Sequence, residues 1–240
     1  MASGELAILK TTAKGGRIVD ELHWLQSLKH MVPNIFQFDE GKNAFLMEYL
    51  QPGEPLKNLI KKGQDDKATR IICNIIKELQ SDQQKNYQFK HLSELVKDLL
   101  HLKDHIDNYT LSKAQSLFQD LCNDTSGDVI LHGDLHHDNI LSYHSGWKVI
   151  DPHGYIGDPI SEIGVMIRNP LDCFPDDKPL AIVLERRLKI LAEELPFDAQ
   201  KMKAWAFCMT ILSAAWNVED LGRAAKSDLE VAFTLDKIKI

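Results

Sequence analysis

The chain lacks an excess of positive charge, and it lacks any long apolar run. Its 28 Lys and Arg are outnumbered by 35 Asp and Glu, which leaves a formal net charge of −7. A nucleic-acid partner requires a cationic surface, so this balance argues against one. The longest stretch without a charged residue, 204–218, is too short to span a bilayer. We therefore expect neither nucleic acid nor membrane as a partner.

Cysteines are few and show no ordered spacing. Cys73, Cys122, Cys173 and Cys208 include no C-x-x-C pair, which is typical of reduced, packed thiols rather than of a disulfide framework. The N-terminus shows no charged-then-apolar signal pattern. The expected location is cytoplasmic.

What the chain does contain is a set of polar side chains at the spacing of a phosphoryl-transfer site. Residues 132–139 read HGDLHHDN, and a polar turn and an apolar stretch then lead to DPHG at 151–154. Protein kinases use H-R-D-x-x-x-x-N followed downstream by D-F-G. Gly133 stands where the kinase arginine would be, but the Asp–Asn spacing is the same.

The chemistry of phosphoryl transfer explains this spacing. An incoming hydroxyl needs a carboxylate to orient it and accept its proton, and the phosphate oxygens need Mg²⁺, which prefers oxygen ligands. Asp134 suits the base, while Asn139 and Asp151 suit the metal. Apolar segments at 129–131, 140–141 and 147–150 are predicted to be strands. The three polar side chains are therefore expected at strand ends around one cleft.

Two other interpretations of this segment remain open. Gly, Asp, Asn and Pro are common in ordinary turns, although both halves of the pattern together favour a kinase-like site. Histidines are also crowded here and could bind zinc in a metallohydrolase. They do not form the H-E-x-x-H pattern common in zinc hydrolases. The crowded histidines are His132, His136, His137, His144 and His153.

Near the N-terminus, a strand over 6–10 that ends in Lys10 precedes an amphipathic helix predicted over 17–31. With about 100° per residue, Glu21 falls at the flank of the apolar stripe and Asp20 on the opposite side. We predict that Glu21 positions Lys10 for ATP phosphates, as the equivalent pair does in kinases. The alternative is a solvated carboxylate at the rim.

The remaining pattern predicts an α+β fold in two parts. A β-hairpin is expected over 35–38 and 44–49, and the Pro- and Gly-containing segment 51–55 then breaks the chain. The rest is mainly helical, with caps at Asp176, Asp177 and Asp198, a stop at Leu221–Gly222, and core positions for Trp205 and Trp216. The predicted helices are 66–80, 91–105, 111–122, 161–168, 179–194, 199–221 and 228–238.

Residues 132–139 resemble the catalytic loop of the aminoglycoside phosphotransferases and their small-molecule kinase relatives. Residues 150–159 and 167–170 are more specifically similar to the streptomycin 6-kinase and hydroxyurea-phosphorylating branch. The resemblance extends more loosely from about residue 5 to about residue 219. It implies a protein-kinase-like fold with a small β-rich N-terminal lobe (1–50), a hinge (51–55) and a larger helical C-terminal lobe (56–240).

The resemblance also implies roles for individual residues. Asp134 would be the catalytic base, Asn139 and Asp151 the magnesium ligands, and His132 and Asp158 the braces of the loop. At the hinge, the Glu48 carbonyl and the Leu50 amide would bind the adenine edge of ATP. The acceptor would be a small cationic or polar molecule with a hydroxyl group, bound on the helical lobe. Acidic candidates for holding it are Asp172, Asp176, Asp177, Glu219 and Asp220.

One departure from that family pattern is expected in the N-terminal lobe. Kinase-like lobes begin with two strands and a glycine-rich loop, but nine residues precede Lys10 and Ser3–Gly4 suits only a turn. We expect a truncated lobe lacking those strands, whose exposed sheet edge could pair with a second chain in a homodimer. A kinase-like binding protein with weak or no catalysis, or a kinase of an unknown housekeeping metabolite, are the alternatives to an aminoglycoside kinase.

Overall fold

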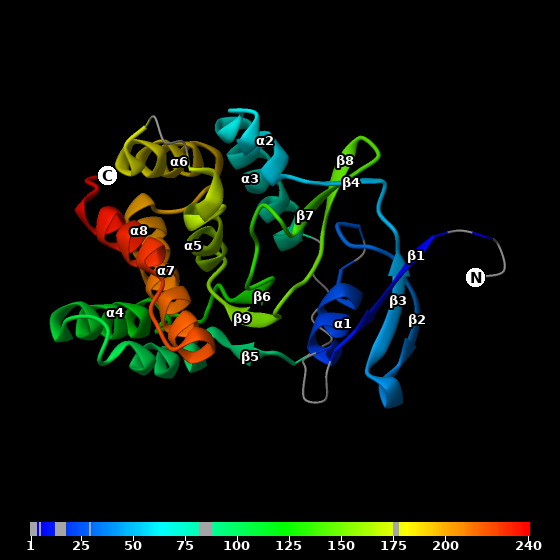
Figure 1. Cartoon of the computed structure of the whole chain (residues 1–240), viewed down its shortest axis with the longest axis horizontal. Helices are drawn as coiled ribbons and strands as arrows, with labels where there is room; N and C mark the ends of the chain where they lie inside the picture. Colours follow the sequence, from blue (N-terminus) through cyan, green and yellow to red (C-terminus); the bar gives the residue numbers. More distant parts are fainter. Residues whose placement is uncertain (1–3, 5, 13–17, 29, 82–87, 175–177) are drawn as a thin grey trace.

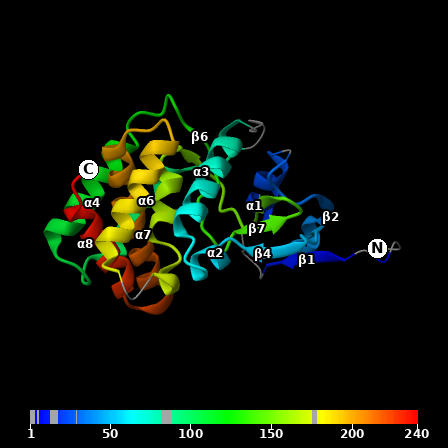
Figure 2. The same cartoon turned by 90° about the horizontal axis from the view of Figure 1, so that it is seen from above.

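The chain folds into a small β-rich part followed by a larger, mainly helical part (Figures 1 and 2). The computed structural model describes residues 4, 6–12, 18–28, 30–81, 88–174 and 178–240. Figure 1 shows the N-terminal sheet at one end of the molecule and helices α4–α8 at the other. The predicted α+β arrangement is confirmed.

The N-terminal sheet contains β1 (Ala7–Thr11), β2 (Ile35–Asp39) and β3 (Ala44–Glu48), in the order β1-β3-β2 and antiparallel throughout. The hairpin between β2 and β3 is confirmed. Asp39 closes its turn by accepting a hydrogen bond from the Lys42 amide at 3.1 Å. Strand β1 lies at the sheet edge, and pairing with a second chain at that edge stays a prediction.

Helix α1 (Ile18–Gln26) buries Ile18, Leu22, Trp24 and Leu25 in a core shared with the inner face of β3. The predicted helix ran to residue 31, and this end is wrong. The Ser27 hydroxyl donates to the Trp24 carbonyl at 2.7 Å, a local bond that competes with continuation of the helix. The predicted start at residue 17 lies outside the described residues.

The predicted catalytic loop connects two further three-stranded sheets. The first has the order β4 (Pro52–Pro55), β7 (Ile140–Tyr143) and β8 (Gly146–Val149), and the second the order β5 (Lys90–His91), β9 (Tyr155–Gly157) and β6 (Val129–Leu131). The loop leaves β6 and enters β7, so it crosses from one sheet to the other. Strands β4, β5 and β9 were not predicted from the sequence.

Contacts made by Met31 and Glu48 join the N-terminal part to the β7–β8 hairpin. The Val149 amide donates to the Met31 carbonyl at 2.8 Å. The Lys148 ammonium lies 2.7 Å from a Glu48 carboxylate oxygen and 4.0 Å from the centre of the Tyr143 ring. Tyr143 also donates its hydroxyl to Glu48. These contacts form a seam between the two parts, which we call the β3–β8 seam.

Helices make up most of the remainder: α2 (Lys57–Lys61), α3 (Asp65–Ser81), α4 (Asn108–Leu121), α5 (Ser161–Arg168), α6 (Leu180–Glu194), α7 (Ala199–Leu221) and α8 (Lys226–Lys237), with short 3₁₀ turns at Glu40–Lys42 and Leu171–Cys173. The cap at Asp198 is confirmed, as is the stop at Gly222, where φ is +69°. The predicted caps Asp176 and Asp177 lie outside the described residues. Among the helices described, none is long and apolar enough to cross a membrane.

The segment predicted as a helix over 91–105 is instead a 3₁₀ helix, η2 (Leu92–Leu102), preceded by strand β5. The His91 ring accepts a hydrogen bond from the Ser93 amide at 3.2 Å, which fixes the start of η2 one residue after the strand. Leucines at 92, 95, 99 and 102 are all buried. Their mixed spacing of three and four fits either type of helix, so periodicity could not decide between them.

Helix α7 is the centre of the larger part, and it meets α5 at very short range. A Cβ placed on Gly164 of α5 would lie 2.5 Å from the Met209 Cβ and 2.8 Å from the Trp205 carbonyl oxygen. Glycine is therefore required because two helix backbones approach each other here.

Replacing this glycine should destabilise the fold. We expect Gly164→Ala to lower the free energy of unfolding by about 1–3 kcal/mol, the usual cost of overpacking a core. Chemical denaturation measures this loss. Gly127→Ala is the control, because nothing lies within 4 Å of a Cβ built there. Equal stability of the two variants would contradict the close approach.

Candidate active site

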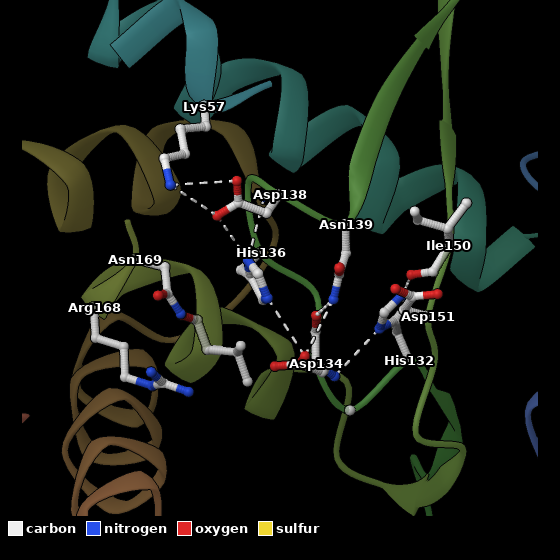
Figure 3. Close-up of polar contacts among 12 residues, drawn as sticks. Lys57, His132, Asp134, His136, Asp138, Asn139, Ile150, Asp151, Arg168 and Asn169 are labelled. Carbon is white, nitrogen blue, oxygen red and sulfur yellow. Dashed lines mark hydrogen bonds and ion pairs between the residues drawn. The ribbon is translucent and has the colours of Figure 1, made fainter. Parts of the chain in front are cut away.

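The loop after β6 is held by the ring of His132. Its Nδ1 accepts a hydrogen bond from the Asp134 amide at 3.2 Å, so Nε2 carries the proton and donates to the Ile150 carbonyl at 2.9 Å (Figure 3). Burial lowers the pKa of His132 to about 4, which keeps the ring neutral. His132 thus links the loop to the strand that leads into Asp151, the bracing position that the resemblance implied.

Gly133 permits the sharp turn into the loop. Its φ is +79°, and a Cβ here would lie 2.6 Å from the Tyr155 ring. The glycine that departs from the protein-kinase pattern is therefore required both by the backbone angle and by Tyr155.

The Asp134 carboxylate is oriented by two side chains of its own loop. Asn139 donates its amide to Oδ2 at 3.1 Å, and His136 Nε2 lies 3.4 Å from the same oxygen (Figure 3). His136 Nδ1 accepts from the Asp138 amide at 3.2 Å, which leaves the ring proton on Nε2. Both donors address Oδ2, so Oδ1 is the oxygen left for an incoming hydroxyl.

These contacts also determine the charge of Asp134. Burial raises the pKa of its carboxyl, but the hydrogen bond from His136 and the nearby histidines outweigh burial and bring the pKa below its ordinary value. Asp134 is therefore ionised near neutral pH and able to accept a proton.

Asn139 and Asp151 lie next to each other at one end of the β7–β8 strand pair. The Ile150 amide donates to the Asn139 carbonyl at 3.0 Å, and Asp151 follows directly with a φ of +59°. Because Asn139 uses its amide nitrogen on Asp134, its side-chain oxygen is available to a metal. Asn139, Asp134 and Asp151 all line one cavity of about 440 Å³.

Lys10 and Glu21 line the same cavity from the N-terminal part. Lys10 Nζ lies 2.5 Å from Glu21 Oε1 and also forms an ion pair with Asp151. The contact between Glu21 and Lys10 is the one that helical periodicity predicted. Burial lowers the pKa of Lys10, but the bonds to Asp151 and Glu21 outweigh it and raise that pKa, so Lys10 is charged.

A second cavity, of about 370 Å³, adjoins the first and shares Lys10 and Asp151 with it. The predicted hinge residues Glu48 and Leu50 line this cavity, and its other walls are mainly apolar. These apolar residues are Ile8, Met47, Leu141 and Ile150. The arrangement offers a mainly apolar slot beside a charged cavity.

The side chain of Glu48 is occupied in the β3–β8 seam. Burial raises the pKa of its carboxyl, but the bonds from Lys148 and Tyr143 outweigh it and lower that pKa. Its carboxylate therefore bonds to Lys148 and Tyr143 of the seam. Only its backbone carbonyl could accept a hydrogen bond from a ligand in the slot.

Glu162 is a site residue that sequence reasoning missed. It lies fully buried in the first turn of α5, and its Oε1 accepts the backbone amides of His132 and Gly133, the latter at 3.3 Å. It therefore supports the loop between β6 and β7 through that loop's backbone. No local signal identifies it, because the 29-residue separation from Gly133 is closed only by the fold.

Asp158, predicted as a brace of the loop, makes its described contacts elsewhere. It accepts from the Ile160 amide at 2.9 Å, from Trp205 Nε1 at 2.9 Å and from Lys201 at 2.8 Å. These bonds attach the start of α5 to α7. The support that Asp158 gives to the loop is therefore indirect, through the helix that carries Glu162.

The other sequence candidates are more dispersed. Asp172 pairs with Lys57 at 3.0 Å, and Glu219 lies 3.7 Å from His101. Asp220 is exposed, while Asp176 and Asp177 lie outside the described residues. Within the described ranges, no group of three or more His, Cys, Asp or Glu could hold a metal ion, so the crowded histidines do not form a zinc site there.

The burial of Glu162 generates a prediction about pH. Burial raises the pKa of its carboxyl from 4.5 to about 7, so the folded state binds a proton that the unfolded state has already lost between those values. Stability from this group is therefore full below about pH 4.5 and decreases as the pH rises to about 7.

We expect Glu162→Gln to remove this dependence. Between pH 5 and pH 7.5, the unfolding free energy of the native chain should fall relative to the variant by on the order of 3 kcal/mol. Denaturant titrations of both proteins across that range measure the difference. Parallel pH profiles would show that Glu162 titrates like an exposed carboxyl.

Comparison with known proteins identifies the family that this chain resembles. The model of the family described as aminoglycoside/hydroxyurea antibiotic resistance kinase matches residues 1–221. The chain is 33% identical to streptomycin 3''-kinase of Klebsiella pneumoniae over 188 residues, which cover 76% of this chain and 70% of that protein. It is 26% identical to streptomycin 6-kinase of Streptomyces glaucescens, over 82% of this chain and 65% of that one.

The fold also resembles that of solved kinase structures. Choline kinase LicA from Streptococcus pneumoniae superposes with a TM-score of 0.68 at 18% identity, covering 98% of this chain and 86% of the other. The two-lobe, protein-kinase-like arrangement that the sequence implied is thereby confirmed.

Proposed function

Because this chain belongs to the aminoglycoside/hydroxyurea antibiotic resistance kinase family, and is a phosphotransferase with an alcohol group as acceptor, we propose its reaction in more detail. It transfers the γ-phosphoryl group of ATP, with Mg²⁺, to a hydroxyl of a streptomycin-like antibiotic. The observation that carries this proposal is the convergence of Lys10, Asp134, Asn139 and Asp151 on one cavity.

The nucleotide fits the two adjoining cavities. The apolar slot suits an adenine ring, with the Glu48 carbonyl and the Leu50 amide at its edge. Lys10 and Asp151 line both cavities, which supports a nucleotide whose base lies in the slot and whose phosphates lie beside these charged groups. Glu21 holds the Lys10 ammonium in that position, since an ammonium tethered by a carboxylate loses less freedom on binding a phosphate.

Asn139 and Asp151 provide the oxygen donors that a magnesium ion prefers, one neutral and one anionic. Bound there, Mg²⁺ would neutralise charge on the phosphate oxygens. Asp151 presently neutralises Lys10, so a bound nucleotide would exchange that ion pair for contacts of each group with the phosphates and metal.

Asp134 acts on the acceptor. Its Oδ1 orients the hydroxyl and takes its proton as the new oxygen–phosphorus bond forms and the bond to the ADP oxygen breaks. Asn139 and His136 keep the carboxylate still through Oδ2. Positioning supplies most of the rate acceleration, because a loose phosphoryl-transfer transition state needs little from a base.

The acceptor is proposed to be a cationic, hydroxyl-bearing antibiotic because two similar proteins are streptomycin kinases. The net charge of −7 is compatible with a cationic substrate. The reaction is proposed to take place in the cytoplasm, where ATP is available and where the four free cysteines would stay reduced.

Asp134→Asn tests the role of the base. We expect phosphorylation of streptomycin to fall by roughly 10²–10⁴-fold, while ATP binding, measured by calorimetry, stays nearly unchanged because Asp134 does not line the apolar slot. The exposed Asp104→Asn variant is the charge-matched control. A protein that binds ATP but phosphorylates no acceptor even as wild type would instead be a kinase-like binding protein.

Asp151→Asn tests the metal site. The gain in ATP affinity on adding Mg²⁺ should fall at least roughly tenfold, the loss that even an outer partner of a metal ligand causes. Affinity for ATP without Mg²⁺ should stay equal or rise, since Lys10 is released from its ion pair with Asp151. Calorimetry with and without the metal separates the two effects. Equal loss under both conditions would exclude a metal-binding role.

A further inference from the structure

A small cavity lies between α3, β6 and the start of α5. Its volume is about 10 Å³, which is room for one water molecule and no more. It shares no lining residue with the catalytic cavity. Its walls are apolar, with residues such as Ile76, Val129 and Leu131, except at two side chains, Gln80 and Glu162. These two polar groups decide what the cavity can hold.

Gln80 brings an unused hydrogen-bond donor to the cavity. It lies in the last turn of α3, and its side-chain nitrogen Nε2 is buried without a hydrogen-bond partner among the described residues. An amide group that leaves water without gaining a new partner destabilises the fold. A molecule that accepts a hydrogen bond from Gln80 Nε2 inside the cavity would remove this cost.

Glu162 brings an acceptor with spare capacity. Its Oε1 accepts the amides of His132 and Gly133, whereas the described contact of Oε2 is a longer one with the Gly133 amide, at 3.4 Å. An ionised carboxylate can accept about four hydrogen bonds, so Oε2 can accept another. The cavity wall therefore offers one donor and one acceptor, and a single water molecule can join them.

The ionisation of Glu162 determines how strongly it holds the loop, because hydrogen bonds to a charged acceptor are roughly twice as strong as neutral ones. Burial raises the pKa of Glu162, its bonds to the two amides lower that pKa, and the charge of Asp134 raises it again. The nearby ring of His132 is kept neutral by burial. Among the described residues that line the small cavity, Glu162 is the only titratable group. A donor within the cavity would therefore favour the ionised form of Glu162.

We propose that this cavity binds one internal water molecule, which accepts a hydrogen bond from Gln80 Nε2 and donates one to Glu162 Oε2. Two hydrogen bonds are within the range that internal waters make. Gln80 is then a positioning residue for the catalytic loop: through the water it holds Glu162, which holds the two amides directly before Asp134. The water site is independent of the proposed function, and its effect on turnover rests on that function.

Gln80→Met tests the donor, because it keeps the length and the helix propensity of the side chain. Losing a hydrogen bond to the charged form should raise the pKa of Glu162 by about one unit. Since stability from Glu162 is lost as the pH rises through its folded-state pKa, the fall in the free energy of unfolding should level out about one pH unit higher than in the wild type. Denaturant titrations from acid to alkaline pH measure the shift. Gln119→Met, at an exposed position of α4, is the control.

A second variant leaves both polar side chains in place. Val129→Ile adds a methyl group to the cavity wall, which takes the space of the water, so it should shift the stability profile in the same direction as Gln80→Met. In a Glu162→Gln background, neither substitution should change the pH profile. Crystal structures of the wild type and of the two single variants show the water directly, and we expect it in the wild type alone.

Turnover tests the positioning role. With a pKa of about 7, Glu162 of the wild type is about half ionised at pH 7, and a pKa about one unit higher would leave roughly a tenth ionised. Phosphorylation of streptomycin by Gln80→Met should therefore have a kcat roughly fivefold lower at pH 7 and should match the wild type near pH 9. The KM for ATP should stay within about threefold, because neither residue lines a nucleotide cavity. A substitution that only weakened the fold would not be rescued by raising the pH.

The outcomes separate the water site from the proposed function. A wild-type crystal structure with a dry cavity would overturn the water site, and so would a Gln80→Met stability profile identical to that of the wild type. A kcat that stays low at pH 9 would remove the positioning role, since the defect would then not follow the ionisation of Glu162. If the wild type phosphorylated no acceptor, the proposed function would fail, and the crystal structures and stability profiles would still decide the water site.

Discussion

The position of the Lys10 ammonium between two carboxylates is the interaction on which the site depends. Glu21 is 11 residues away along the chain and Asp151 is 141 residues away, so this one cation joins α1, β1 and the segment after β8. Glu21 is the buried member of this set, and its ion pair with Lys10 offsets the cost of burying its charge. The same pairing places an ammonium and two carboxylates in the wall of the cavity. A site for a phosphate and its metal requires charges of both signs.

The catalytic loop is supported mainly through backbone groups. Glu162 accepts two amides beneath it, His132 connects it to Ile150, and Gly133 allows it to pass the Tyr155 ring. Each support acts on the peptide chain rather than on the side chains of Asp134 and Asn139, which bond to each other. The Asp134 carboxylate is thereby held in one orientation by side chains of its own loop.

The sequence predicted the parts of this structure that depend on residues close together in the chain. Periodicity located α1 and the contact of Glu21 with Lys10, and the turn between two apolar runs located the β2–β3 hairpin. The spacing of Asp134, Asn139 and Asp151 indicated one cleft because short strands flank each residue. Helix α7 was located by its caps, Asp198 and Gly222.

What the sequence could not show depends on partners distant in the chain. Strands β4, β5 and β9 are two to four residues long and are defined only by pairing with β7, β9 and β6. Glu162 resembles any acid in the first turn of a helix until the loop is folded above it. Trp216 shares a helix with Trp205 and, as expected, packs against the core, but it is only partly buried, and its hydrogen bond to Asp98 of η2 depends on a partner distant in the chain.

The β3–β8 seam has a mechanical consequence. Glu48 lines the apolar slot and bonds to Lys148 and Tyr143, and the Met31–Val149 hydrogen bond joins the two parts nearby. Translation of one lobe away from the other would break all of these contacts at once, and it would leave the Lys148 charge buried without its partner.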